Sequence, residues 1–296
     1  MPMNKEKLQA LIQLLDDPNQ EVNQTVTQNL LDQGTGILPD LEAAWEDSMD
    51  SDYQEKLINL IQEIQVKSTN DMLKSWISAG SSDLLQGAFL IARYQYPDLQ
   101  LQDIEQPLDK IIRDVWLELN DNLTALEKIR ILNHILFEVN GFKKNTKNFY
   151  SPQNSFINQV LETRKGNPIS LAVVYSIIAQ KLGLPVFGVN LPKNFILAYK
   201  DELIRGDNFD EVTEDILFYI NPYNKGAVLG RREIDHFLKQ QDIESQSSHY
   251  LPCSNKDIII RILHNLMNAY HKSGDREKAE QFDAILRMIT DPGAAG

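Results

Sequence analysis

One stretch of the chain, residues 164–226, restricts the possible folds more than any other. It contains a long apolar segment, LAVVYSIIAQKL, which begins just after Asn167 and Pro168 and is followed by Gly183. Asparagine is a favoured N-cap residue, proline has no amide to leave unpaired at the first helical position, and glycine often follows a helix. The apolar surface is wide enough for a helix that is covered by protein. We therefore expect one buried helix that begins at Pro168 and ends at Gly183.

Three short segments after this helix have the composition of β-strands. They read VFGVNL, NFILAY and ILFYINPY, and they carry the β-branched and aromatic residues that favour strands. Pro192 and Lys193 separate the first two segments and indicate a turn. The stretch as a whole predicts a helix that lies against a small antiparallel sheet.

The motifs of this region resemble a known family. NPISL, LGLP, GVNLPKNF and INPYNKG occur in this order, and further matching residues lie at 132–155 and in the C-terminal helices. They are similar to the bacterial SirB-type family of transglutaminase-like proteins, the regulator of SirC expression type, which has a C-terminal tetratricopeptide (TPR) segment. The resemblance implies a papain-like α+β core. In such a core the catalytic Cys lies at the helix start, the His on the following strand and the Asp on the next strand.

The resemblance also implies that this catalytic triad is degenerate. The nucleophile position falls at or beside Pro168, and Ser170 is the nearest side chain that could attack a substrate. Family members generally lack the Cys but usually keep the His and the Asp, where this chain has Asn194 and Asn221. An amide neither accepts a proton near neutral pH nor carries the charge that stabilises an imidazolium. We therefore expect no catalytic residue among Ser170, Asn194 and Asn221.

Three hypotheses for the function follow. The first is a non-catalytic protein-binding or regulatory protein that keeps the degenerate cleft as a recognition site. The second is a hydrolase or acyltransferase that acts on amide or isopeptide bonds through a non-standard nucleophile such as Ser170. The third is a structural role without a ligand, in which the asparagines only make turns and caps. If the papain-like arrangement holds, the binding residues that line the cleft are Arg164, Asn167, Asn190, Asn194, Asn221, Tyr223 and Asn224.

Helices are expected on both sides of this core. Residues 5–119 show apolar residues at i, i+3 and i+4 in successive segments, with turn signals between them, one of them at residues 68–70. The first of these segments resemble a HEAT repeat, and residues 255–292 resemble a TPR hairpin. We expect a mainly α protein with a central α+β papain- or transglutaminase-like core. Its predicted parts are a HEAT-like helical region at 1–120, a transglutaminase-like core at 121–245 and a TPR-like helical hairpin at 246–296.

Composition limits the partners. A net charge of −13 argues against binding to a phosphate backbone, so we expect no direct nucleic-acid partner. The single cysteine, Cys253, excludes an internal disulfide and suits a reducing cytosol. The N-terminus shows no signal-peptide pattern, and no apolar run approaches the ~20 residues that span a bilayer. We expect a cytoplasmic protein with a protein or peptide partner and no membrane partner.

Two further groups of residues do not make a convincing site. The acid-rich segment KDELIRGDNFDEVTED lacks the ligand spacing of a calcium loop, and a solvated hairpin loop is the simpler interpretation. His249 and Cys253 are four residues apart, but Pro252 lies between them and no third group orients the imidazole. We therefore predict no metal and no cofactor.

Overall fold

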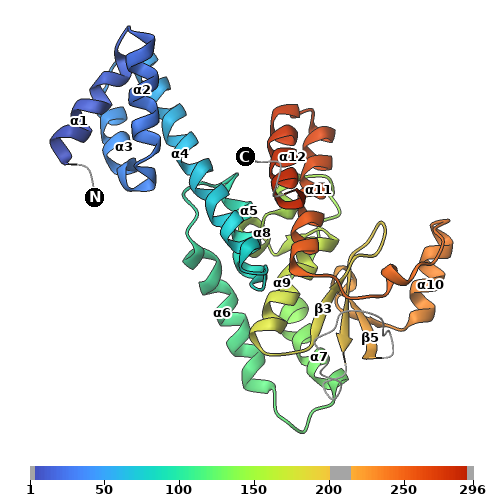
Figure 1. Ribbon diagram of the computed structural model, residues 1–296. Coiled ribbons are helices and arrows are strands. Elements are labelled where there is room, and N and C mark those ends of the chain that lie inside the picture. Colours follow the sequence, from blue (N-terminus) through green and yellow to red (C-terminus); the bar gives the residue numbers. More distant parts are fainter. Residues whose placement is uncertain (1–3, 201–214, 292–296) are drawn as a thin grey trace. The chain divides into compact units, whose positions relative to one another are not determined.

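The computed structural model describes residues 4–200 and 215–291, and the chain divides into two units (Figure 1). The acid-rich segment at 201–214 lies outside the described residues. The first unit comprises Met1–Ser75 and Arg93–Asp98, and the second comprises Trp76–Ala92 and Leu99–Gly296. Each unit has apolar residues that its own helices or strands bury, so each is described by itself.

The first unit is helical. Its elements are α1 (Lys5–Gln13), η1 (Leu14–Asp16), α2 (Gln20–Leu31), η2 (Gly34–Ile37), α3 (Leu38–Asp47) and the part of α4 (Ser51–Ser78) up to residue 75. Asn4 and Asn19 cap α1 and α2, because each side chain accepts a hydrogen bond from an amide of the first turn. One apolar cluster, which includes Leu30, Leu41 and Leu57 with no exposed surface, holds these helices together.

One predicted helix break in this unit is wrong. The sequence indicates a turn at residues 68–70, but α4 continues through it. Thr69 is buried, and its hydroxyl donates to the carbonyl of Gln65 one turn earlier, at 2.8 Å. The Asn70 side chain accepts a hydrogen bond from the Tyr94 hydroxyl at 2.5 Å. Polar side chains that favour a turn in isolation here have partners that are compatible with a helix.

The second unit combines helices with a small sheet. Its helical elements after α4 are α5 (Leu84–Arg93), α6 (Leu101–Glu118), α7 (Ala125–Asn133), the π-helical η3 (His134–Val139), η4 (Pro152–Ser155), α8 (Ile157–Thr163), α9 (Pro168–Lys181), η6 (Pro222–Asn224), α10 (Arg231–Gln240), η7 (Ser247–His249), α11 (Asn255–Ser273) and α12 (Arg276–Thr290). Its strands are β1 (Lys143–Lys144), β2 (Lys165–Gly166), β3 (Val186–Val189), β4 (Ile196–Lys200), β5 (Ile216–Asn221) and β6 (Ala227–Leu229).

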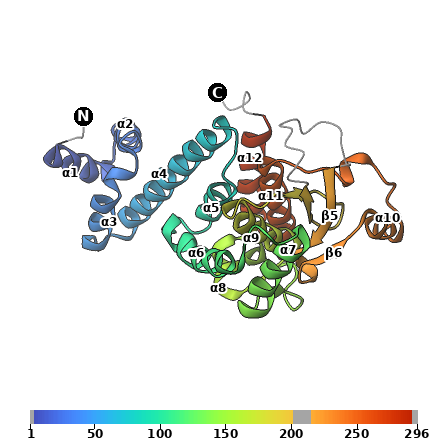
Figure 2. The same ribbon diagram turned by 90° about the horizontal axis from the view of Figure 1, so that it is seen from below.

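Helix α9 lies in the middle of this unit, as Figure 2 shows. It packs against α6, α8 and α11 as well as against β3 and β4. Every residue from Ile169 to Ala179 is buried, as expected for a helix that protein covers on all sides. The predicted start at Pro168 is confirmed, and Gly183, at a φ of +69°, follows the helix end as predicted.

The sheet is antiparallel in the order β3-β4-β5-β6. The predicted strands correspond to β3, β4 and β5, whereas the sequence did not predict β6 or the short parallel pair of β1 and β2. Residues of α10 pack on one face, where Ile234 and Leu238 meet Ile196 and Ala198 of β4. On the other face Tyr199 lies near Tyr175 of α9. The sheet is thus covered on both faces.

Helices α11 and α12 form a hairpin that packs side by side (Figure 1). Gly274 adopts a φ of +83° at the end of α11, and the Asp275 side chain accepts from the Lys278 amide at 3.0 Å to cap α12. Gly274 and Asp275 therefore form the turn between the two helices. α11 also packs against α9 and η4, which brings a C-terminal helix to the start of the central helix.

Candidate functional site

The first turn of α9 is held by reciprocal hydrogen bonds between Asn167 and Ser170. The Ser170 amide donates to the Asn167 side chain at 2.9 Å, and the Asn167 amide donates to Ser170 Oγ at 3.0 Å. Asn167 also donates from its side-chain nitrogen to Ser155 Oγ at 2.9 Å. Asn167 and Ser170 are buried, at 7% and 3% exposure. These bonds fix the helix start rigidly against η4.

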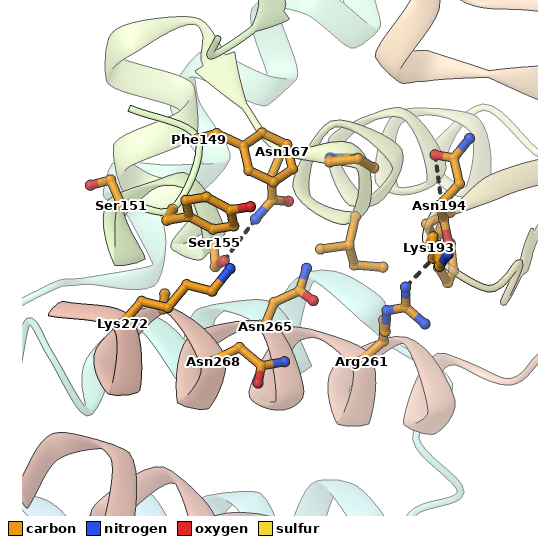
Figure 3. A pocket seen from close by; sticks show the side chains of 15 residues that line it. Phe149, Ser151, Ser155, Asn167, Lys193, Asn194, Arg261, Asn265, Asn268 and Lys272 are labelled. Atoms are coloured by element: carbon orange, nitrogen blue, oxygen red, sulfur yellow. Dashed lines mark hydrogen bonds between the residues drawn. The ribbon is translucent and has the colours of Figure 1, made fainter. Parts of the chain in front are cut away.

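A cleft of about 470 Å³ opens at this helix start (Figure 3). It lies where α9, the turn between β3 and β4, the segment before η4 and helix α11 meet. The residues that line the cleft are Phe149, Tyr150, Ser151, Ser155, Asn167, Pro168, Ile169, Lys193, Asn194, Phe195, Arg261, Asn265, Asn268, Ala269 and Lys272.

Helix α11 forms one wall of the cleft with four polar side chains, which we call the polar row: Arg261, Asn265, Asn268 and Lys272. Their spacing of four, three and four residues places them on one face of the helix, and Figure 3 shows them side by side along α11 toward the cavity. Within the described residues, no hydrogen bond joins the Asn265 or Asn268 side chain to the protein. Both amides are therefore free to bind a ligand.

Arg261 connects the polar row to the sheet. Its guanidinium donates to Asn190 Oδ1 at 2.9 Å and to the Asn194 carbonyl oxygen at 3.4 Å. Burial lowers the pKa of the Arg261 guanidinium, because desolvation disfavours the charged form. Two hydrogen bonds thus hold a partly desolvated cation at one end of the cleft.

Aromatic side chains lie at the other end. Phe149 and Tyr150 pack edge to face with ring centroids 5.0 Å apart, and both are exposed. Lys272 Nζ lies 3.3 Å from the centroid of the Tyr150 ring, a cation–π contact. Lys272 is therefore held over an aromatic ring, and no described acidic residue forms an ion pair with it.

The predicted site residues fall into two groups. Asn167 and Asn194 line the cleft, and Asn190 positions Arg261 beside it. Pro168, at the position that the resemblance gives to the nucleophile, lines it as well. The remaining predicted residues are not part of the lining: Arg164, Ser170, Asn221, Tyr223 and Asn224.

Several of these remaining residues have structural partners. The Asn221 side chain accepts from the Asn224 amide at 3.3 Å and so caps η6. Lys144 Nζ lies 5.9 Å from the Tyr223 ring centroid. Arg164, at a φ of +57°, stacks its guanidinium 4.8 Å from the Phe142 ring centroid, and burial lowers its pKa. These residues therefore lie outside the lining of the cleft.

The sequence analysis missed the polar row. The C-terminal segment was expected only as a TPR-like hairpin, although the row stands out in α11 as polar residues on one helical face between apolar ones. That periodicity was the available signal. It did not show which element the polar face would meet.

The described lining of the cleft lacks the residue types of the transglutaminase-type triad. Among the described residues that line it, none is a Cys, His, Asp or Glu. Cys253 is no substitute, because burial raises the pKa of its thiol to about 12. His249 Nδ1 accepts from the Gln246 amide at 3.2 Å and does not pair with Cys253.

The described residues also lack a metal-binding cluster and a membrane-spanning helix. No group of three or more His, Cys, Asp or Glu side chains lies close enough together to hold a metal ion. None of the helices in the described ranges combines the length and apolarity that crossing a membrane requires.

The chain is similar to named proteins of bacteria and animals. A "UPF0162 protein" of Xylella fastidiosa (strain 9a5c) is 28% identical over 230 residues, which cover 74% of this chain and 78% of the relative. Human F-box only protein 21 is 28% identical over 231 residues, which cover 70% of this chain but 35% of the human protein. No solved structure shows a significant match.

A family model supplies the assignment. The model described as "Transglutaminase-like superfamily" matches residues 102–264, more than half of the chain. The matched region contains α9, the four-stranded sheet and Arg261, and it ends just before the rest of the polar row. The chain therefore belongs to the transglutaminase-like superfamily.

Proposed function

We propose that this chain is a non-catalytic protein-binding or regulatory protein whose degenerate transglutaminase-like cleft binds peptide. One observation carries this proposal. The cleft at the start of α9 is walled by amides, cations and aromatic rings, and no described lining residue is a Cys, His, Asp or Glu.

The surroundings of Ser170 support a role without catalysis. Ser170 Oγ accepts from the Asn167 amide and donates to the Asn167 carbonyl at 3.3 Å, so both of its functions are occupied within the cap. Among the described residues, no imidazole is hydrogen-bonded to it. A serine hydroxyl needs a neighbouring base to become a nucleophile. Ser170 is better explained as a residue that holds the helix start.

The chemistry of the lining supports a peptide as ligand. An asparagine side chain both donates and accepts hydrogen bonds, as a peptide group does. Asn265 and Asn268 offer such groups from one helical face, and Phe149 and Tyr150 offer aromatic surface nearby. A peptide needs this combination of backbone hydrogen bonds and apolar contact.

Peptide selection would test this proposal. We would select a random peptide display library on the full chain and on Asn268→Trp, which fills the cleft from an exposed position. The matched control is His271→Trp, on the same helix but outside the lining. We expect enrichment on the native chain and on H271W, and its loss on N268W. Equal enrichment on N268W, or no enrichment at all, would contradict a peptide-binding cleft.

Hydrolysis or acyl transfer through Ser170 is the alternative. A fluorophosphonate probe, which labels activated serines, tests it directly. We expect no labelling of the native chain, since Ser170 is buried and has no base. Labelling that disappears in Ser170→Ala would establish the alternative.

The subfamily, the cellular location and the division into parts are also proposals. We infer membership of the bacterial SirB-type subfamily and a cytoplasmic location, supported by the motifs and by the single cysteine. We also propose three parts: a HEAT-like region at 1–120, a transglutaminase-like core at 121–245 and a TPR-like hairpin at 246–296. The α11–α12 hairpin and the helix pairs of the first unit are compatible with these repeat types.

A further inference from the structure

The charge of the cleft differs from the charge of the chain. The chain has 29 Lys and Arg against 42 Asp and Glu, a net charge of −13. The described lining nevertheless contains three cations, Lys193, Arg261 and Lys272, and no carboxylate. None of the three forms an ion pair with a described acidic residue. A concentrated positive site on an acidic protein favours a ligand that brings negative charge.

Arg261 is the strongest anion-binding group in the cleft. A guanidinium has five N–H donors, and two of them bind Asn190 and Asn194, which leaves three. Its two partners are neutral amide oxygens, and no described carboxylate forms an ion pair with it. A partly buried cation without a counter-charge is unfavourable, and a carboxylate from outside would remove this cost.

The spacing of the cations sets the length of the ligand. Arg261 and Lys272 lie at opposite ends of the polar row, eleven residues apart on one helix. At a rise of 1.5 Å per residue they are separated by about 16 Å along α11. An extended peptide rises about 3.3 Å per residue and covers this distance with about five residues. An inorganic anion or a single amino acid cannot contact both ends.

We propose that the cleft binds an extended acidic peptide segment along α11, with an acidic side chain at each end. This inference rests on the proposed peptide-binding function. One carboxylate pairs with Arg261 and the other with Lys272, about five residues apart. Asn265 and Asn268 bind the peptide groups between them. Lys193, in the turn opposite the Arg261 end, adds to the local positive charge.

Fluorescence anisotropy with short labelled peptides would test the proposal. The first peptide has a glutamate near each end, five residues apart, and neutral residues elsewhere, and the second has glutamines in their place. We expect the glutamate peptide to bind at least about tenfold more tightly, because each charge-assisted hydrogen bond contributes more than a neutral one. Its affinity falls as salt is added, since part of the site is exposed.

Charge-removing variants assign the effect to the cleft. Lys272→Gln changes an exposed residue, so the fold is retained, and Arg261→Gln is compared with it. Each is expected to weaken the glutamate peptide about tenfold and to leave the glutamine peptide nearly unchanged. The matched control is Lys239→Gln, which removes the same charge from an exposed site on α10 outside the lining. K239Q is expected to leave both affinities as in the native chain.

The outcomes separate the two proposals. Equal binding of the glutamate and glutamine peptides, with loss of both in N268W, would overturn the acidic preference and leave the peptide cleft standing. Equal effects of K272Q and K239Q would overturn the assignment to the polar row. Failure of the glutamate peptide to bind, while library peptides without acidic residues are enriched, would overturn this inference but not the proposed function.

Discussion

Two polar regions of the second unit use the same residue types in opposite ways. Behind α9, the Asn133 side chain accepts from the Tyr175 hydroxyl at 3.0 Å and donates to the Gly226 carbonyl at 2.8 Å. We call these three residues the interior asparagine cluster. In the cleft, by contrast, no described protein group binds the side chains of Asn265 and Asn268. The interior asparagine cluster is hydrogen-bonded within the protein. The Asn265 and Asn268 side chains have no described protein partner and can bind a ligand.

This difference separates stabilising polar groups from recognition groups. Tyr175 is fully buried, so its hydroxyl depends on Asn133 for a partner, and a lost partner would cost free energy of folding. Asn268 is exposed and water can satisfy it, so the folded state does not depend on it. Substitutions in the interior asparagine cluster are therefore expected to lower stability, and substitutions in the polar row are expected to lower peptide affinity.

Alkaline pH is expected to have the largest effect, and it acts on the interior. Burial raises the pKa of the Cys253 thiol from 9.0 to about 12, and it raises the pKa of Tyr175 well above 10. Below pH 9 both groups are protonated in the folded and unfolded chain, and this contribution to stability is fully present. Above pH 9 the unfolded chain loses protons first, so stability falls as the pH approaches 12. For Cys253 alone the loss is up to about 4 kcal/mol, at about 1.4 kcal/mol per pKa unit.

Urea unfolding at a series of pH values from 8 to 12 would measure this loss. Cys253→Ala is the control, because it removes the thiol and is expected to reduce the pH dependence to the part that Tyr175 contributes. A free energy of unfolding that is constant over this range would show that neither group is as buried as the structure indicates.

Asn133→Ala is expected to have the next largest effect. The change leaves the buried Tyr175 hydroxyl and the Gly226 carbonyl without their partner, and unsatisfied buried groups cost about 1–3 kcal/mol each. We expect the free energy of unfolding to fall by about 3 kcal/mol. Denaturant unfolding at pH 7 measures it, and a loss below about 1 kcal/mol would mean that water replaces Asn133.

Asn167→Ala is expected to have an intermediate effect on stability. Asn167 is a buried cap of α9 that also lines the cleft. The substitution removes the cap of α9 and the hydrogen bond to Ser155, and loss of an asparagine cap costs about 0.5–2 kcal/mol. Asn167→Asp keeps the capping oxygen but not the donor to Ser155, so we expect it to recover part of the loss. If N167D were no more stable than N167A, the cap would not be the source of the effect.

The local features of the core could be predicted from the sequence. Asn167 and Pro168 determine the start of α9 through their own side chains, and β-branched and aromatic residues identify β3, β4 and β5. β6 has only three residues, too few for a strand pattern, and it is fixed by pairing with β5. The helical continuation of α4 through Thr69 also depends on contacts made in the folded unit.

The cleft was only partly predictable because its walls come from distant parts of the chain. Asn167 and Asn194 follow from the helix and strand motifs, but Arg261 reaches Asn190 across 71 residues of sequence. The Cys253 amide donates to the Gly188 carbonyl at 2.7 Å, and this bond joins the segment just before α11 to β3. No local pattern specifies this docking, so the polar row could be recognised as a polar face but not assigned to the cleft.

Asn268→Ala is expected to have the smallest effect on stability, and it tests most directly whether the polar row differs from the interior asparagine cluster. Its side chain is exposed and has no described protein partner, so the free energy of unfolding should change by less than about 0.5 kcal/mol. Peptide affinity, measured by anisotropy with a library-selected peptide, is expected to fall about fivefold, as for one lost neutral hydrogen bond. Asn133→Ala, where it remains folded, is expected to show the reverse pattern. If N268A destabilised the chain as much as N133A, the polar row would be structural and the distinction between the two regions would fail.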